Sequence, residues 1–178
     1  MDALTGKTKQ DYGTPPELLL AVRQRFGPIV WDLAARRDNA VTGWWYGPGS
    51  GYGVDSLAED WDATPSSYCG SHGVLWCNPP FKRAAPWVAK AAAYRGPGTI
   101  CMLVLASVGS TWFAEYVHDK ALVLALRPRV TFVGESQGFN KDLMLCVYGP
   151  QITPGFDLWQ WRQSARVLAS SMPRSGAL

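Results

Sequence analysis

The run Asn78-Pro79-Pro80-Phe81 contains the residue types needed to act on an amino group. An exocyclic amine of a nucleobase is a weak nucleophile, because its lone pair is delocalised into the ring. The amide oxygen of Asn78 can accept one N–H of such an amine. The carbonyl of Pro79 can accept the other, since the proline ring fixes the backbone that aims it. Both bonds favour charge on the attacking nitrogen, and Phe81 can stack on a base that has left the helix.

The alternative for these four residues is structural: a rigid Pro-Pro turn in which Asn78 caps and Phe81 packs. Their position favours chemistry, because Asn78 directly follows the apolar run 74–77, which is typical of a buried strand. A second short apolar run, 29–33, contains Asp32 near its end. Ligands of α/β sheets bind at the carboxyl ends of the strands, so we expect Asp32 and Asn78 to lie at one site.

Apolar strands that alternate with helices predict an α/β fold with a mainly parallel sheet. The last two strands, 130–133 and 143–148, are expected to form an antiparallel hairpin at its edge. Helices are expected after Thr14, at 86–94, 111–118 and 157–169, and further strands at 99–105 and 121–126. For the first helix, Thr14 is the expected N-cap, Pro15 suits the first turn and Glu17 completes a capping box.

The 178 residues fit one domain, and only 17% of them are charged, which favours a folded core over disorder. The longest uninterrupted apolar run, 100–106, is too short to span a bilayer, so no membrane partner is expected. The first ten residues contain no apolar stretch, and the four cysteines form no C-x-x-C pair. We therefore expect a cytoplasmic protein with free thiols. With two histidines, no metal site is expected.

The charge is divided unevenly along the chain. Residues 1–80 carry six Lys and Arg against nine Asp and Glu, whereas residues 81–178 carry eleven against five. The second part could therefore face a polyanion such as nucleic acid, although an uneven surface charge without function is the alternative.

The NPPF run is similar to the (D/N/S)-PP-(Y/F) motif of S-adenosylmethionine-dependent amino-methyltransferases. The order of the other segments resembles the phage-type DNA N6-adenine methyltransferases (phage Dam family) over residues 11 to 149. The resembling segments are DYGTPPELL at 11–19, WDLAA at 31–35, VDSLAEDW at 54–61, VLWCNPPF at 74–81, PWVAKAA at 86–92, TWF at 111–113 and RPRVTF at 127–132.

The resemblance implies a Rossmann-like methyltransferase fold in residues 1–150, followed by a C-terminal helical extension, 151–178. It implies that S-adenosylmethionine is the cofactor and that Asp32 pairs with its ammonium group. The other residues that it assigns to the cofactor are Tyr12, Thr14, Pro15, Ala34, Asp55, Leu57 and Asn78. The glycine-rich turn of many methyltransferases is missing after Asp32, which leaves Asp38 or Asn39 as the nearest candidate for the ribose contact.

Double-stranded DNA is the partner that the resemblance implies, with the methyl group going to the N6 amine of a flipped adenine. A phage or prophage enzyme of this kind would protect DNA from restriction in a bacterial host, or mark it. The candidate DNA contacts are Lys82, Arg83, Trp112, Arg129, Asn140 and Lys141.

Other readings keep part of this assignment. The same amine chemistry would serve cytosine N4, RNA or protein glutamine. A non-catalytic nucleic-acid-binding module with a decayed methyltransferase fold is a further alternative.

Overall fold

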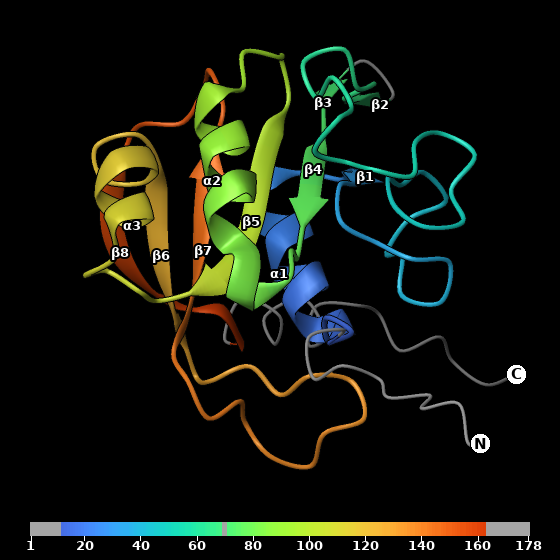
Figure 1. Cartoon of the computed structure of the whole chain (residues 1–178). Coiled ribbons are helices and arrows are strands. Elements are labelled where there is room, and N and C mark those ends of the chain that lie inside the picture. The colour runs from blue at the N-terminus through green and yellow to red at the C-terminus, as the bar shows by residue number, and fades with distance from the viewer. Residues whose placement is uncertain (1–11, 69–70, 163–178) are drawn as a thin grey trace, which may run out of the picture.

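The structure is a computed structural model, which describes residues 12–68 and 71–162. A six-stranded sheet forms its centre (Figure 1). In spatial order the strands are β1 (Ile29–Asp32), β4 (Val74–Cys77), β5 (Thr99–Leu105), β7 (Leu143–Tyr148), β6 (Leu122–Arg127) and β8 (Gly155–Gln160). A separate antiparallel pair, β2 (Ser67–Tyr68) and β3 (Ser71–His72), precedes β4.

Helices cover both faces of the sheet. The helix α1 (Pro16–Phe26) lies on one face, and α2 (Ala84–Ala93) and α3 (Thr111–Tyr116) lie on the other (Figure 1). Strands β4, β5 and β7 are apolar apart from Thr99, the first residue of β5, because alternate residues face the α1 side and the α2–α3 side. Within the described residues, every helix is too short or too polar to cross a lipid bilayer.

The expected α/β class and mainly parallel sheet are confirmed. Parallel pairing joins β1 to β4, β4 to β5 and β6 to β8. The expected edge hairpin is wrong: β7 lies inside the sheet, antiparallel to both β5 and β6. The segment 130–133 forms no strand. Its backbone forms hydrogen bonds with loop residues instead. The N–H of Val133 donates to the carbonyl of Gly13, and the carbonyl of Val130 accepts from the N–H of Phe139.

The C-terminal part also differs from the expectation. Residues 157–160, expected to be helical, belong to β8, which pairs with β6 along its whole length. A strand of the main sheet therefore begins at Gly155, inside the segment expected to be a helical extension. The expected helical residues 163–169 lie outside the described part of the chain.

The capping box predicted for the first helix is wrong as well. The N-cap is Pro15, which makes no side-chain cap hydrogen bond, and Pro16 is the first helical residue. A proline suits this position because its missing N–H would have no partner inside the helix. The hydroxyl of Thr14 is consequently available to the site described next.

Candidate active site

The carboxyl ends of β1, β4, β5 and β6 lie along one edge of the sheet, because these strands run in the same direction. The turn after Asp32, the NPPF run and the loop 128–142 leave from this edge. In Figure 1 the loop 128–142 extends below the sheet, on the side towards which β4 points. The segment before α1 joins them there, as the next contacts show.

Asn78 is held by the segment that precedes α1. Its amide nitrogen donates to the backbone carbonyl of Tyr12 at 3.0 Å and to the hydroxyl oxygen of Thr14 at 3.3 Å. A carbonyl only accepts, so the contact with Tyr12 fixes which side of the Asn78 amide carries the nitrogen. Both amide protons are used in these bonds, and the amide oxygen remains as the group that can act on a substrate.

Asp32 is buried at the end of β1, with 2% of its surface exposed. Its two carboxylate oxygens accept the backbone N–H groups of Ala34 and Val41, both at 3.1 Å. Burial raises the pKa of Asp32 to about 6, and these two hydrogen bonds partly oppose the rise. Asp32 therefore holds the turn 33–41 in shape, and its carboxyl group has a raised pKa.

A cavity of about 210 Å³ lies between these segments. The predicted residues that line it are Tyr12, Ala34, Asn39, Asn78 and Pro80, and Ala35, Arg36 and Pro48 complete the wall. Pro48 reaches the cavity because Gly47 packs directly against Ala35, in the turn after β1: at its φ of 140°, a Cβ would lie 1.9 Å from the carbonyl oxygen of Ala35. The site thus joins three sequence-distant segments, 12–14, 32–48 and 78–80.

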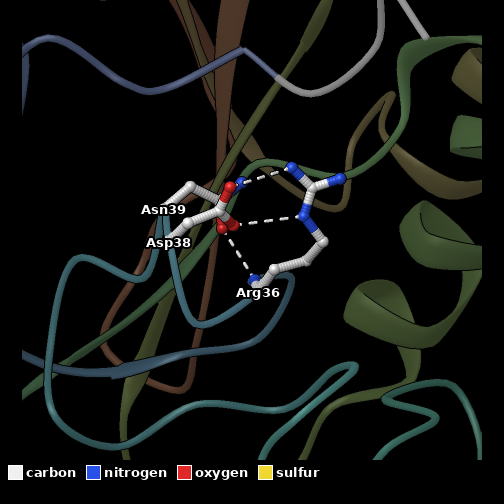
Figure 2. Close-up of polar contacts among 3 residues, drawn as sticks. All are labelled: Arg36, Asp38 and Asn39. Atoms are coloured by element: carbon white, nitrogen blue, oxygen red, sulfur yellow. Dashed lines mark hydrogen bonds and ion pairs between the residues drawn. The ribbon is translucent and has the colours of Figure 1, made fainter. Parts of the chain in front are cut away.

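The two candidates for a ribose contact have different surroundings. The Asp38 carboxylate accepts from the guanidinium of Arg36 at 3.2 and 3.3 Å and is exposed (Figure 2). Asn39 lines the cavity, and its side-chain oxygen accepts the backbone N–H of Arg36 at 2.7 Å. Of the two, only Asn39 lines the cavity.

The predicted adenine contacts, Asp55 and Leu57, do not line this cavity. Asp55 is exposed and accepts the backbone N–H of Leu57 at 3.1 Å. The carbonyl of Leu57 accepts from Lys90 of α2 at 3.0 Å. This turn is therefore fixed against α2 and stands apart from the Asn78 cavity.

A comparison with models of protein families identifies the family of this chain. The family model described as DNA N-6-adenine-methyltransferase (Dam) matches residues 3–147, most of the chain. The chain belongs to the Dam family. Among curated proteins, no sequence matches the chain significantly. Membership confirms the resemblance that the NPPF run and its neighbouring segments indicated, and it gives this protein a DNA adenine methyltransferase assignment.

The candidate DNA contacts of this Dam-family protein lie on segments that follow the carboxyl ends of β4, β5 and β6. Lys82 and Arg83 are exposed on the short 3-10 helix η1 (Phe81–Arg83), directly after Pro80. Trp112 is partly buried at the start of α3 and packs on the core. On the loop 128–142, Asn140 and Lys141 are exposed, and Arg129 pairs with Asp142 at 2.9 Å.

Two groups of residues at this Dam-family site were not predicted. The sequence around Arg36 does not mark it as a site residue, because Arg36 lines the cavity only through the turn that Asp32 holds. Phe132 and Phe139 contact Tyr12 and Phe81, although these rings come from three distant parts of the sequence. The sequence shows that the loop 128–142 contains aromatic residues, but it does not show that their rings pack against Tyr12 and Phe81.

Proposed function

We propose that the protein transfers a methyl group from S-adenosylmethionine to the N6 amine of an adenine flipped out of double-stranded DNA. The observation that carries this proposal is the orientation of Asn78. Its amide nitrogen is occupied by Tyr12 and Thr14, so its oxygen faces away from them at the wall of the cavity.

The chain's residues act on the target amine as acceptors. The amide oxygen of Asn78 takes one N–H, and the carbonyl oxygen of Pro79 takes the other. The next carbonyl, that of Pro80, is already bonded to the N–H of Arg83 at 2.9 Å. Two acceptors fixed before the reaction stabilise the charge that develops on the amine nitrogen, since no reorganisation is needed as it forms. Phe81 remains partly exposed and in this proposal stacks on the flipped base.

The residues in and around the cavity have side chains of the types that would bind the methionine end of the cofactor. Asp32 places a buried negative charge beneath the turn, which favours an ammonium group nearby. Tyr12, Ala34 and Asn39 line the cavity, where Ala34 leaves space for close approach and Asn39 offers an amide. Thr14 and Pro15 do not line it and belong to the segment that holds Asn78. A cavity of about 210 Å³ is small for a whole cofactor. We assign the adenosine end to Asp55 and Leu57. When bound, S-adenosylmethionine supplies a methyl group on a sulfonium, an electrophile that needs no metal.

Double-stranded DNA would approach the carboxyl edge of the sheet. The exposed side chains of Lys82, Arg83 and Lys141 suit phosphate contacts there, and Asn140 suits a base edge. Trp112 and Arg129 complete the proposed surface. In a phage or prophage setting such methylation would protect DNA from restriction or mark it.

Incubation of the purified protein with labelled S-adenosylmethionine and double-stranded DNA, followed by nucleoside analysis, tests the proposal. We expect labelled N6-methyladenine and no labelled N4-methylcytosine. Labelled N4-methylcytosine, labelled RNA in a parallel reaction, or DNA binding with no methyl transfer would each overturn the adenine assignment.

A further inference from the structure

Four aromatic rings beside the NPPF run form one cluster, which we call the four-ring cluster: Tyr12, Phe81, Phe132 and Phe139. Every ring contacts the other three, at centroid distances from 4.8 to 6.3 Å. Tyr12 stacks on Phe132 at 4.8 Å, and Phe139 meets Tyr12 edge-on at 5.3 Å. Aromatic pairs in these geometries attract each other beyond their burial of apolar surface.

The four-ring cluster joins the loop 128–142 to both parts of the site. Tyr12 supplies the carbonyl that holds Asn78, and Phe81 is the last residue of the NPPF run. Two backbone bonds reinforce the contact: Val133 donates to Gly13 at 3.0 Å, and Phe139 donates to Val130 at 2.7 Å. The ion pair between Arg129 and Asp142 closes the base of the loop.

Phe139 occupies a special place on this loop. Its ring turns inward to Tyr12, Phe81 and Phe132, whereas the next two residues, Asn140 and Lys141, are exposed. A DNA contact made by Asn140 or Lys141 would therefore act on the backbone next to Phe139 and could move its ring. Phe139 is partly buried and packs against the core cluster that contains Phe132, so its ring joins the loop to the core.

We propose that Phe139 is a positioning residue, which couples the seating of the loop 128–142 on DNA to the orientation of Asn78. The coupling runs through its ring contacts with Tyr12 and Phe81, and the inference rests on the proposed function. Phe132, which is 2% exposed, anchors the same cluster to the core. A loop that is not seated loosens Tyr12, and with it the hydrogen bond that aims the Asn78 amide oxygen.

The test compares Phe139→Leu, Phe139→Tyr and the control Phe156→Leu in the full chain. The first removes the ring and keeps apolar volume, and the second keeps the ring. Phe156 is 67% exposed on β8, outside the four-ring cluster. Steady-state methylation gives kcat and the KM for DNA, and thermal melting checks the fold. Limited trypsin digestion measures the rate of cleavage at Arg129 and Lys141 without any methylation.

We expect Phe139→Leu to lower kcat by about tenfold with a smaller change in the KM for DNA, since it removes the three ring contacts of Phe139. Phe139→Tyr should keep a kcat close to that of the wild type, and Phe156→Leu should match the wild type. Cleavage at Lys141 should become faster in Phe139→Leu and in Tyr12→Leu. An unchanged kcat in Phe139→Leu overturns the coupling, as does a loss that only raises KM.

A wild type without any N6-methyladenine would instead refute the proposed function. In that case the trypsin cleavage rates still test whether the ring of Phe139 holds the loop 128–142 in place. Cleavage at Lys141 that is equally slow in Phe139→Leu, Tyr12→Leu and the wild type would overturn the inference by itself.

Discussion

The amide nitrogen of Asn78 donates to the backbone carbonyl of Tyr12 across 66 positions of sequence. This bond links the motif that would act on the target amine to the segment that would close over the cofactor. Because a backbone carbonyl cannot donate, the bond leaves the Asn78 amide with one possible orientation, and in the proposed reaction its oxygen would face the substrate. The same segment carries Thr14, whose hydroxyl takes the second amide proton.

Replacement of Thr14 should weaken this orientation without disturbing the fold of α1. Thr14→Val keeps the side-chain shape but removes the oxygen that accepts from Asn78. We expect kcat to fall by about three- to tenfold, the effect of one neutral hydrogen bond. Thr14→Ser keeps the hydroxyl and should stay near the wild type. The predicted role of Thr14 is wrong if Val and Ser behave alike in steady-state methylation.

The affinity for S-adenosylmethionine should depend on pH through Asp32. Burial raises the pKa of this carboxyl to about 6, so it is charged at pH 7 but only about one tenth ionised at pH 5. A negative charge near the ammonium strengthens binding, and the dissociation constant should therefore rise by up to about tenfold from pH 7 to pH 5.

Calorimetry at both pH values measures this effect. The Asp32→Asn variant serves as its control, because it should bind weakly at both pH values and lose the pH dependence. A wild-type affinity that stays constant between pH 5 and pH 7 would contradict the role of Asp32.

The close packing of Gly47 on the turn after β1 should depend on its lack of a side chain. A Cβ at this residue would lie 1.9 Å from the Ala35 carbonyl oxygen, and the backbone has a φ of 140°. We expect Gly47→Ala to lower the melting temperature by about 5 °C or more, since strain and a backbone clash act together. In Gly51→Ala, the new Cβ meets nothing within 4 Å, and this variant should melt like the wild type.

Arg83 should contribute to DNA affinity through a phosphate. It is exposed directly after the NPPF run, and Arg83→Gln should weaken binding and lower the salt slope of log K by about one. Arg95 is exposed after α2, where its guanidinium bonds the carbonyls of Ala92 and Tyr94. Arg95→Gln should therefore leave the slope unchanged. Fluorescence anisotropy over a salt series distinguishes the two variants, and equal slopes would remove Arg83 from the proposed DNA surface.

The strand ends at Asp32 and Asn78 could be predicted because each is a polar residue at the end of a short apolar run. Parallel strands bring such ends to one edge, so two local patterns were enough to place them together. The bond between Asn78 and Tyr12 could not be predicted, because it depends on how α1 packs against the sheet.

The errors at the C-terminal side have a similar cause. Val130 and Phe132 are buried and their neighbours are more exposed, as in a strand, yet the backbone of this segment pairs with loops. In and just after β8, the apolar residues Leu158, Trp159 and Trp161 suit a helix as well as a strand. Only the parallel pairing with β6, a long-range contact, decides for the strand.

Single-turnover methylation by wild type and Asn78→Ala, at saturating S-adenosylmethionine and DNA, tests the role of the Asn78 amide most directly. Saturation removes any difference in binding, so that the rate reports the chemical step. We predict that Asn78→Ala forms N6-methyladenine at least about a hundredfold more slowly, the usual cost of removing one fixed polar group from a charged transition state. A variant that melts like the wild type and methylates adenine at the wild-type rate would contradict the account.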